Sequence, residues 1–106
     1  MPTRLFTDLL GRSIRLTEER KLHLQTEHPE MTGQLPNIEE ALANPDKIIR
    51  SGIDEAVELF YKYYPSTPVT EKFLCLVVKT VPHDNFIITA YYTDTIKRGE
   101  ILWETS

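Results

Sequence analysis

Three kinds of side chain in this sequence could act together on a phosphate group: a histidine, several cations and a run of hydroxyls. His28 directly precedes Pro29. We expect a helix to end at His28, because a residue before proline is disfavoured in helical conformation. The helix dipole there would favour the protonated imidazolium, which suits a general acid or a phosphate contact. The alternative is a histidine that only caps the last carbonyls of the helix.

The cations of interest lie in or next to expected strands. Arg50 ends a short apolar strand, and Lys62 and Lys79 are embedded in two longer ones. A lysine in such a strand either extends to water or points into a cleft. If these two lysines lie beside Thr89 and Tyr91 across the sheet, they form a patch that can hold phosphate. Otherwise they protect a strand edge by their charge.

The stretch from Phe86 to Thr93 is rich in β-branched and aromatic residues, which favour a strand. Strict alternation divides it into an apolar face and a hydroxyl-bearing face. The first comprises Phe86, Ile88, Ala90 and Tyr92, and the second comprises Ile87, Thr89, Tyr91 and Thr93. The second face could form the floor of a site. The alternative is a buried strand whose hydroxyls bond to their neighbours.

Composition narrows the possible functions. The chain of 106 residues fits one domain, and its single cysteine, Cys75, rules out a disulfide framework or a multi-cysteine metal site within the chain. No two histidines have the spacing of a zinc-binding helix, so we expect neither a metal nor a cofactor. The net charge of −4 does not favour nucleic-acid binding in general, although a local basic patch is compatible with it. We see no membrane span or signal peptide and expect a cytoplasmic protein.

The order of elements predicts a single α+β domain. We expect a hairpin or arm over residues 1–16, two helices within 17–44, a sheet within 47–94 and a tail over 95–106 that packs through Trp103. The predicted architecture is two N-terminal helices packed on a roughly four-stranded antiparallel sheet. Leu59, Cys75 or Val77, and Ile88 should lie in one core under the helices.

Several segments together resemble a known family. They are HPEM at 28–31, NPDKIIRS at 44–51, VELFYKYYP at 57–65, KFLCLVVK at 72–79 and FIITAYYTDTIKRGEILW at 86–103. In order and spacing they resemble the phage-type branch of the barnase–EndoU–colicin–RelE-like nuclease fold, from Thr17 onward. The resemblance implies helices on a four-stranded antiparallel sheet and metal-independent RNA cleavage by attack of the ribose 2′-OH on the adjacent phosphate. The implied partners are RNA and, for a toxin-like member, a protein inhibitor.

The resemblance also implies roles for particular residues. His28 would be the acid or base, Arg50 or Lys62 the phosphate clamp, and Thr89 a positioning hydroxyl, with Tyr91 in support. We therefore predict that His28, Arg50, Lys62 and Thr89 converge on one cleft, with Lys62 and Thr89 on the same side of the sheet. The alternative functions are a non-catalytic binding module and a phage-derived accessory domain that keep the fold without the reaction.

Overall fold

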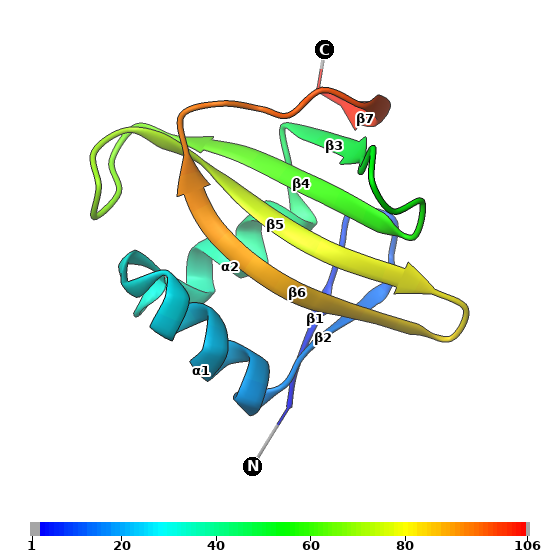
Figure 1. Ribbon diagram of the computed structural model, residues 1–106, viewed down its shortest axis with the longest axis horizontal. Coiled ribbons are helices and arrows are strands. Elements are labelled where there is room, and N and C mark those ends of the chain that lie inside the picture. Colours follow the sequence, from blue (N-terminus) through cyan, green and yellow to red (C-terminus); the bar gives the residue numbers. More distant parts are fainter. Residues whose placement is uncertain (1–2, 106) are drawn as a thin grey trace.

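The computed structural model describes residues 3–105, which form two α-helices and one seven-stranded sheet (Figure 1). The helices are α1 (Glu18–Glu27) and α2 (Leu35–Ala43), with a short 3-10 turn, η1 (Pro29–Met31), between them. The strands are β1 (Arg4–Thr7), β2 (Ser13–Leu16), β3 (Lys47–Arg50), β4 (Val57–Tyr64), β5 (Lys72–Val81), β6 (Asp84–Thr93) and β7 (Glu100–Glu104). Their order across the sheet is β1-β2-β6-β5-β4-β3-β7.

The expected four-stranded antiparallel sheet is therefore wrong. The four predicted strands are present as β3 to β6, but β1 and β2 extend the sheet at one side and β7 extends it at the other. The sheet is mixed, because β2 runs parallel to β6 through the pairs Ile14–Asn85 and Arg15–Phe86. The helices are not N-terminal either, since the β1–β2 hairpin precedes them.

The sheet has two apolar faces, and the helices cover one of them. We call this side the helix face. Its core joins Leu24 of α1 and Ile38 and Leu42 of α2 to Phe60, Leu74 and other buried side chains of the sheet. The i, i+3, i+4 spacing of Ile38, Ala41 and Leu42 accounts for the docking of α2, because it places all three on one side of the helix.

The second apolar cluster lies on the opposite side of the sheet, which we call the open face. It comprises Ile49, Val57, Leu59, Tyr61 and Cys75, with Val77, Ile88 and Tyr91 packed against them. Leu59, Cys75, Val77 and Ile88 thus share a core, as predicted, but not the core under the helices. The prediction was wrong in its choice of face, because strand alternation defines two sides without saying which side the helices cover.

The ends of the helices follow from local signals. The hydroxyl oxygen of Thr17 accepts a hydrogen bond from the backbone N–H of Arg20 at 3.1 Å, as an N-cap does. Helix α1 ends at Glu27, with His28 as its C-cap before Pro29, as expected. Helix α2 begins at Leu35, with a proline in its first turn. The Asn37 side chain donates to the Tyr92 hydroxyl at 3.0 Å and ties α2 to β6.

The turn of the β1–β2 hairpin is fastened to the helix face by one arginine. Arg12 donates to Asp8 at 2.8 Å and to Glu58 of β4 at 2.7 and 3.2 Å. Both carboxylates are buried, and these bonds raise the pKa of Arg12, the contact with Glu58 having the largest effect. The backbone N–H of Leu9 also donates to the carbonyl of Leu42 at 2.9 Å. The hairpin is thereby part of the core and not a loose arm.

The C-terminal segment is a strand. β7 pairs antiparallel with β3, and Trp103 packs against the helix-face core, which confirms that the tail folds back. Gly99 permits this return, because a Cβ there would lie 2.5 Å from the carbonyl oxygen of Arg50. Within residues 3–105, no helix has the length and apolar character needed to cross a membrane.

Candidate functional site

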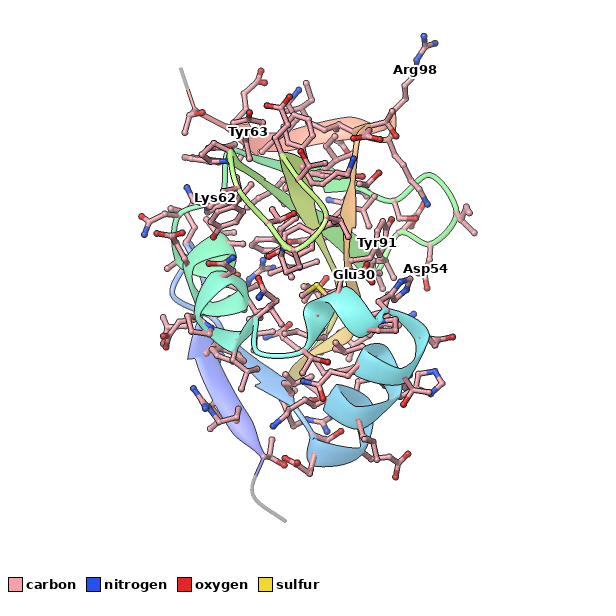
Figure 2. All side chains as sticks on the ribbon, turned by 90° about the vertical axis from the view of Figure 1, so that its left-hand side faces the viewer. Glu30, Asp54, Lys62, Tyr63, Tyr91 and Arg98 are labelled. Carbon is pink, nitrogen blue, oxygen red and sulfur yellow. The ribbon has the colours of Figure 1, made fainter. Side chains whose placement is uncertain are left out.

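The strand registers decide which of the predicted site residues can meet. The registers define rows of residues that lie directly opposite one another across β4, β5 and β6. One row contains Tyr61, Cys75 and Tyr91, and the next contains Leu59, Val77 and Thr89. Both rows are on the open face. Lys62 is opposite Leu74, in a row on the helix face. Figure 2 accordingly places Lys62 near α2 and Tyr91 across the sheet from it. The predicted convergence of Lys62 with Thr89 is wrong.

Lys62 has a partner of its own at the end of α2. Its ammonium donates to the carbonyl of Asn44, the C-cap of that helix, at 2.9 Å, and lies 3.9 Å from a carboxylate oxygen of Asp46. A cation is favoured at a helix C-terminus by the helix dipole. This geometry gives Lys62 a structural role and removes it from the open face.

The Arg50 side chain also has partners of its own, away from His28. Its guanidinium donates to Glu100 of β7 at 3.0 Å and to the carbonyl of Glu55 at 2.8 Å. It therefore joins β3 to the edge strand and to the turn before β4. Neither expected phosphate clamp lies beside the histidine.

His28 does reach the open face, by way of the edge of β6. β2 pairs with β6 at Asn85 and Phe86, so among the described strands the rest of β6 is bordered by β5 alone. α1 and η1 pack along this edge. The His28 ring thereby comes to lie 5.4 Å from the Tyr91 ring, centroid to centroid, with the planes inclined by 33°.

The surroundings of His28 leave its imidazole free to act. The C-cap bond is made by its backbone N–H, which donates to Leu24 at 2.8 Å. Its Nδ1 lies 3.9 Å from a carboxylate oxygen of Glu30, and the side chain is 34% exposed. Within residues 3–105 the ring itself caps no carbonyl, so the alternative of a merely capping side chain does not describe it.

The row next to His28 consists of Tyr61, Cys75 and Tyr91. Sequence patterns did not predict that these three residues lie together. Burial raises the pKa of the Cys75 thiol, while contacts with the hydroxyls of Tyr91 and Tyr61 act in the opposite direction. Burial raises the pKa of Tyr61 to about 12 and also raises that of Tyr91. Both phenols are therefore protonated hydrogen-bond donors at neutral pH.

Thr89 lies one row along the open face from Tyr91. Its hydroxyl oxygen is buried and has no hydrogen-bond partner among the described residues. Buried polar side chains are almost always hydrogen-bonded, so an unpaired one is unusual. The expectation that the hydroxyls of β6 simply bond to their neighbours therefore does not hold for Thr89.

A cation near this row comes from the segment between β6 and β7. The backbone N–H of Lys97 donates to the Tyr61 hydroxyl at 3.1 Å, and Ile96 packs on the open-face cluster. The Lys97 side chain is exposed, and its charge favours the ionised form of Cys75. The neighbouring Arg98 projects away from the body (Figure 2). In the sequence, Lys97 stands in an Ile-Lys-Arg-Gly turn. That pattern indicates a turn but does not show that the segment passes over the open face.

The open face therefore brings together three of the five predicted site residues, His28, Thr89 and Tyr91, and adds Lys97. The part of the chain that the structure describes has no group of three or more His, Cys, Asp or Glu side chains placed to hold a metal ion. Comparison with protein-family models, curated proteins and solved structures finds no match for this chain.

Proposed function

We propose that the open face around His28 and Tyr91 cleaves RNA without a metal ion, as a small cytoplasmic ribonuclease of the barnase–EndoU–colicin–RelE-like kind. The observation that carries the proposal is the packing of the His28 ring on Tyr91 beside the unpaired hydroxyl of Thr89. A partly exposed imidazole and a protonated phenol are groups that can take up and donate protons.

In the proposed reaction, the imidazole of His28 takes the proton from a ribose 2′-OH. The 2′ oxygen then attacks the adjacent phosphorus, and the bond from phosphorus to the 5′ oxygen breaks. The Tyr91 hydroxyl, which is protonated at neutral pH, gives its proton to that leaving oxygen. The phenolate then regains a proton from solvent, and the His28 imidazolium returns its proton to solvent. The products are a 2′,3′-cyclic phosphate and a 5′-hydroxyl end.

The negative charge that develops on the phosphate must be stabilised by a hydrogen-bond donor or a cation. Arg50 and Lys62 cannot serve, because one pairs with Glu100 and the other lies on the helix face. Lys97 takes this role in our proposal, because the Thr89 hydroxyl is buried and does not contact the phosphate directly. Its exposed ammonium sits on the segment that is bonded to the Tyr61–Cys75–Tyr91 row.

The test is incubation of purified protein with total RNA in EDTA, compared with His28→Ala. An acid–base group typically contributes about 10²–10⁴-fold to the rate, so the variant should lose most cleavage. His23→Ala is the matched control, because His23 is an exposed histidine on α1 whose partner is Glu27. Cleavage that survives equally in both variants would refute the assignment.

A non-catalytic RNA-binding module is the second candidate, and one observation favours it. Both expected phosphate clamps, Arg50 and Lys62, are paired within the fold away from His28. A binding module predicts that the protein retains RNA without shortening it, and that Lys97→Ala weakens retention while His28→Ala does not. The ribonuclease predicts that both substitutions slow cleavage.

A further inference from the structure

A small recess lies at the end of the open face, where β4 ends and β5 begins, one step further along β6 from Tyr91. Its lining consists of Tyr63 of β4, Lys72 and Phe73 of β5, Glu71 and Asp94. Its volume is about 200 Å³, which is enough for one nucleobase. None of these residues belongs to the proposed catalytic group.

The register places this recess next to the reaction site. Phe73 is opposite Thr93, and Thr93 lies two residues beyond Tyr91 on the same face of β6. Two residues along a strand span about 7 Å. A nucleotide whose phosphate lies at His28 and Tyr91 can therefore have a neighbouring base at the recess.

The floor of the recess is aromatic. The rings of Tyr63 and Phe73 meet edge to face, with their centroids 5.6 Å apart and their planes inclined by 67°. Tyr63 is 42% exposed and Phe73 is partly buried. Unpaired RNA bases stack on aromatic side chains of this kind, whereas paired bases in a duplex are not accessible for it.

The rim of the recess carries two carboxylates and one ammonium. The Tyr63 hydroxyl donates to Glu71 at 2.5 Å, and Lys72 donates to Asp94 at 2.6 Å. Each carboxylate has further lone pairs, because an ionised carboxylate accepts about four hydrogen bonds. Asp94 is 74% exposed, so its free oxygen faces solvent at the rim.

The two carboxylates distinguish among bases. Adenine, cytosine and guanine carry an exocyclic amino group that donates hydrogen bonds to a carboxylate, whereas uracil offers only its N3–H, flanked by two carbonyl oxygens that would face the carboxylates. Acceptors that face one another form no hydrogen bond. The recess should therefore accept an amino-bearing base and disfavour uracil.

We propose that this recess is a base-binding subsite that takes an unpaired, amino-bearing base of single-stranded RNA next to the bond to be cleaved. The inference rests on the proposed function, since it assigns the substrate of the same face. Phe73 and Tyr63 supply stacking, and Glu71 supplies the preference.

The experiment measures binding of fluorescent 2′-O-methyl hexanucleotides, which lack the attacking hydroxyl and cannot be cleaved by the proposed route. One is uridine throughout, and the others carry a single adenosine or cytidine near the centre. The wild-type protein should bind the substituted hexamers more tightly. Glu71→Gln should remove the difference, because the amide offers a donor as well as an acceptor. Phe73→Ala should weaken binding of all hexamers by about 5-fold or more.

Glu39→Gln, at an exposed position of α2, is the matched control and should leave the preference intact. Absence of any preference in the wild type, a preference unchanged by Glu71→Gln, or no binding of the hexamers would each overturn the subsite. Circular dichroism of Glu71→Gln and Phe73→Ala would show that the fold is retained. The ribonuclease is judged separately, by whether His28→Ala stops cleavage of unmodified RNA.

Discussion

The ring of His28 packs against the ring of Tyr91, with 5.4 Å between the centroids, although His28 ends a helix and Tyr91 faces away from the helices. The contact is possible because β6 has no second strand beside it over most of its length within residues 3–105. The helix layer can therefore reach round the edge of β6. Closing that edge with another strand would separate the two rings.

The alkaline titration of the tyrosines gives a first prediction. The pKa of Tyr61 is raised by burial from 10.0 to about 12, and burial also raises that of Tyr64 and Tyr91. Because the folded pKa of Tyr61 exceeds the unfolded value, its contribution to stability is complete below pH 10 and is lost as the pH rises toward 12. Tyrosinate absorbance should therefore rise together with unfolding.

Two phenylalanine variants sharpen this prediction. Tyr61→Phe removes one of the groups that must ionise, so alkaline unfolding should shift to higher pH. Tyr63→Phe is the control, because Tyr63 is exposed and its pKa is raised mainly by the hydrogen bond to Glu71. An absorbance change in the folded protein centred near pH 10 for all five tyrosines would contradict the account.

The ion pair of the hairpin gives a second prediction. Glu58→Gln leaves Arg12 with one carboxylate in a largely buried setting. Removing one partner of a buried pair is strongly destabilising, so we expect a loss of about 3 kcal/mol in the free energy of unfolding. Glu100→Gln breaks the exposed pair with Arg50 and should cost about 1 kcal/mol or less. Equal effects in urea denaturation would show that the hairpin is not anchored in this way.

The C-terminal strand gives a third prediction. Trp103 packs on the helix-face core, so Trp103→Ala should lower the free energy of unfolding by about 2–4 kcal/mol. Leu22→Ala is the comparison, since Leu22 is 66% exposed on α1 and its loss should be nearly neutral. Thermal unfolding of the two variants measures the contrast. A Trp103→Ala protein as stable as the wild type would mean that β7 contributes little.

The thiol gives a fourth prediction. Cys75 is fully buried, and burial raises the pKa of its thiol, so the native protein should react very slowly with a thiol reagent. The reaction should accelerate in denaturant in step with unfolding. Rapid modification of the folded protein would show that the open face opens around Cys75.

Sequence patterns were a good guide within single elements. They placed the end of α1 before Pro29, the strands β3 to β6 and the return of Trp103, because proline geometry and strand alternation are local properties. They did not predict that β2 joins β6. That parallel pairing links residues about seventy positions apart, and nothing in the four residues Ser13–Leu16 specifies the partner.

The candidate site was harder to predict for two reasons. A register shift in the β5–β6 pairing, between Val77 and Val78, interrupts the alternation of β6, so Ile87 joins Ala90 and Tyr92 in the helix-face core and not Thr89 on the open face. The register between strands also decides that Lys62 and Thr89 are on opposite sides, and alternation within each strand cannot show this.

The most direct test of the ribonuclease proposal uses an oligonucleotide with one ribonucleotide among deoxyribonucleotides, incubated with the protein in EDTA. The proposal predicts cleavage at that ribonucleotide, a 2′,3′-cyclic phosphate on the product by mass spectrometry, and a rate that falls about 10²–10⁴-fold in His28→Ala but not in His23→Ala. An intact oligonucleotide after long incubation, or equal cleavage by wild type and His28→Ala, would contradict it.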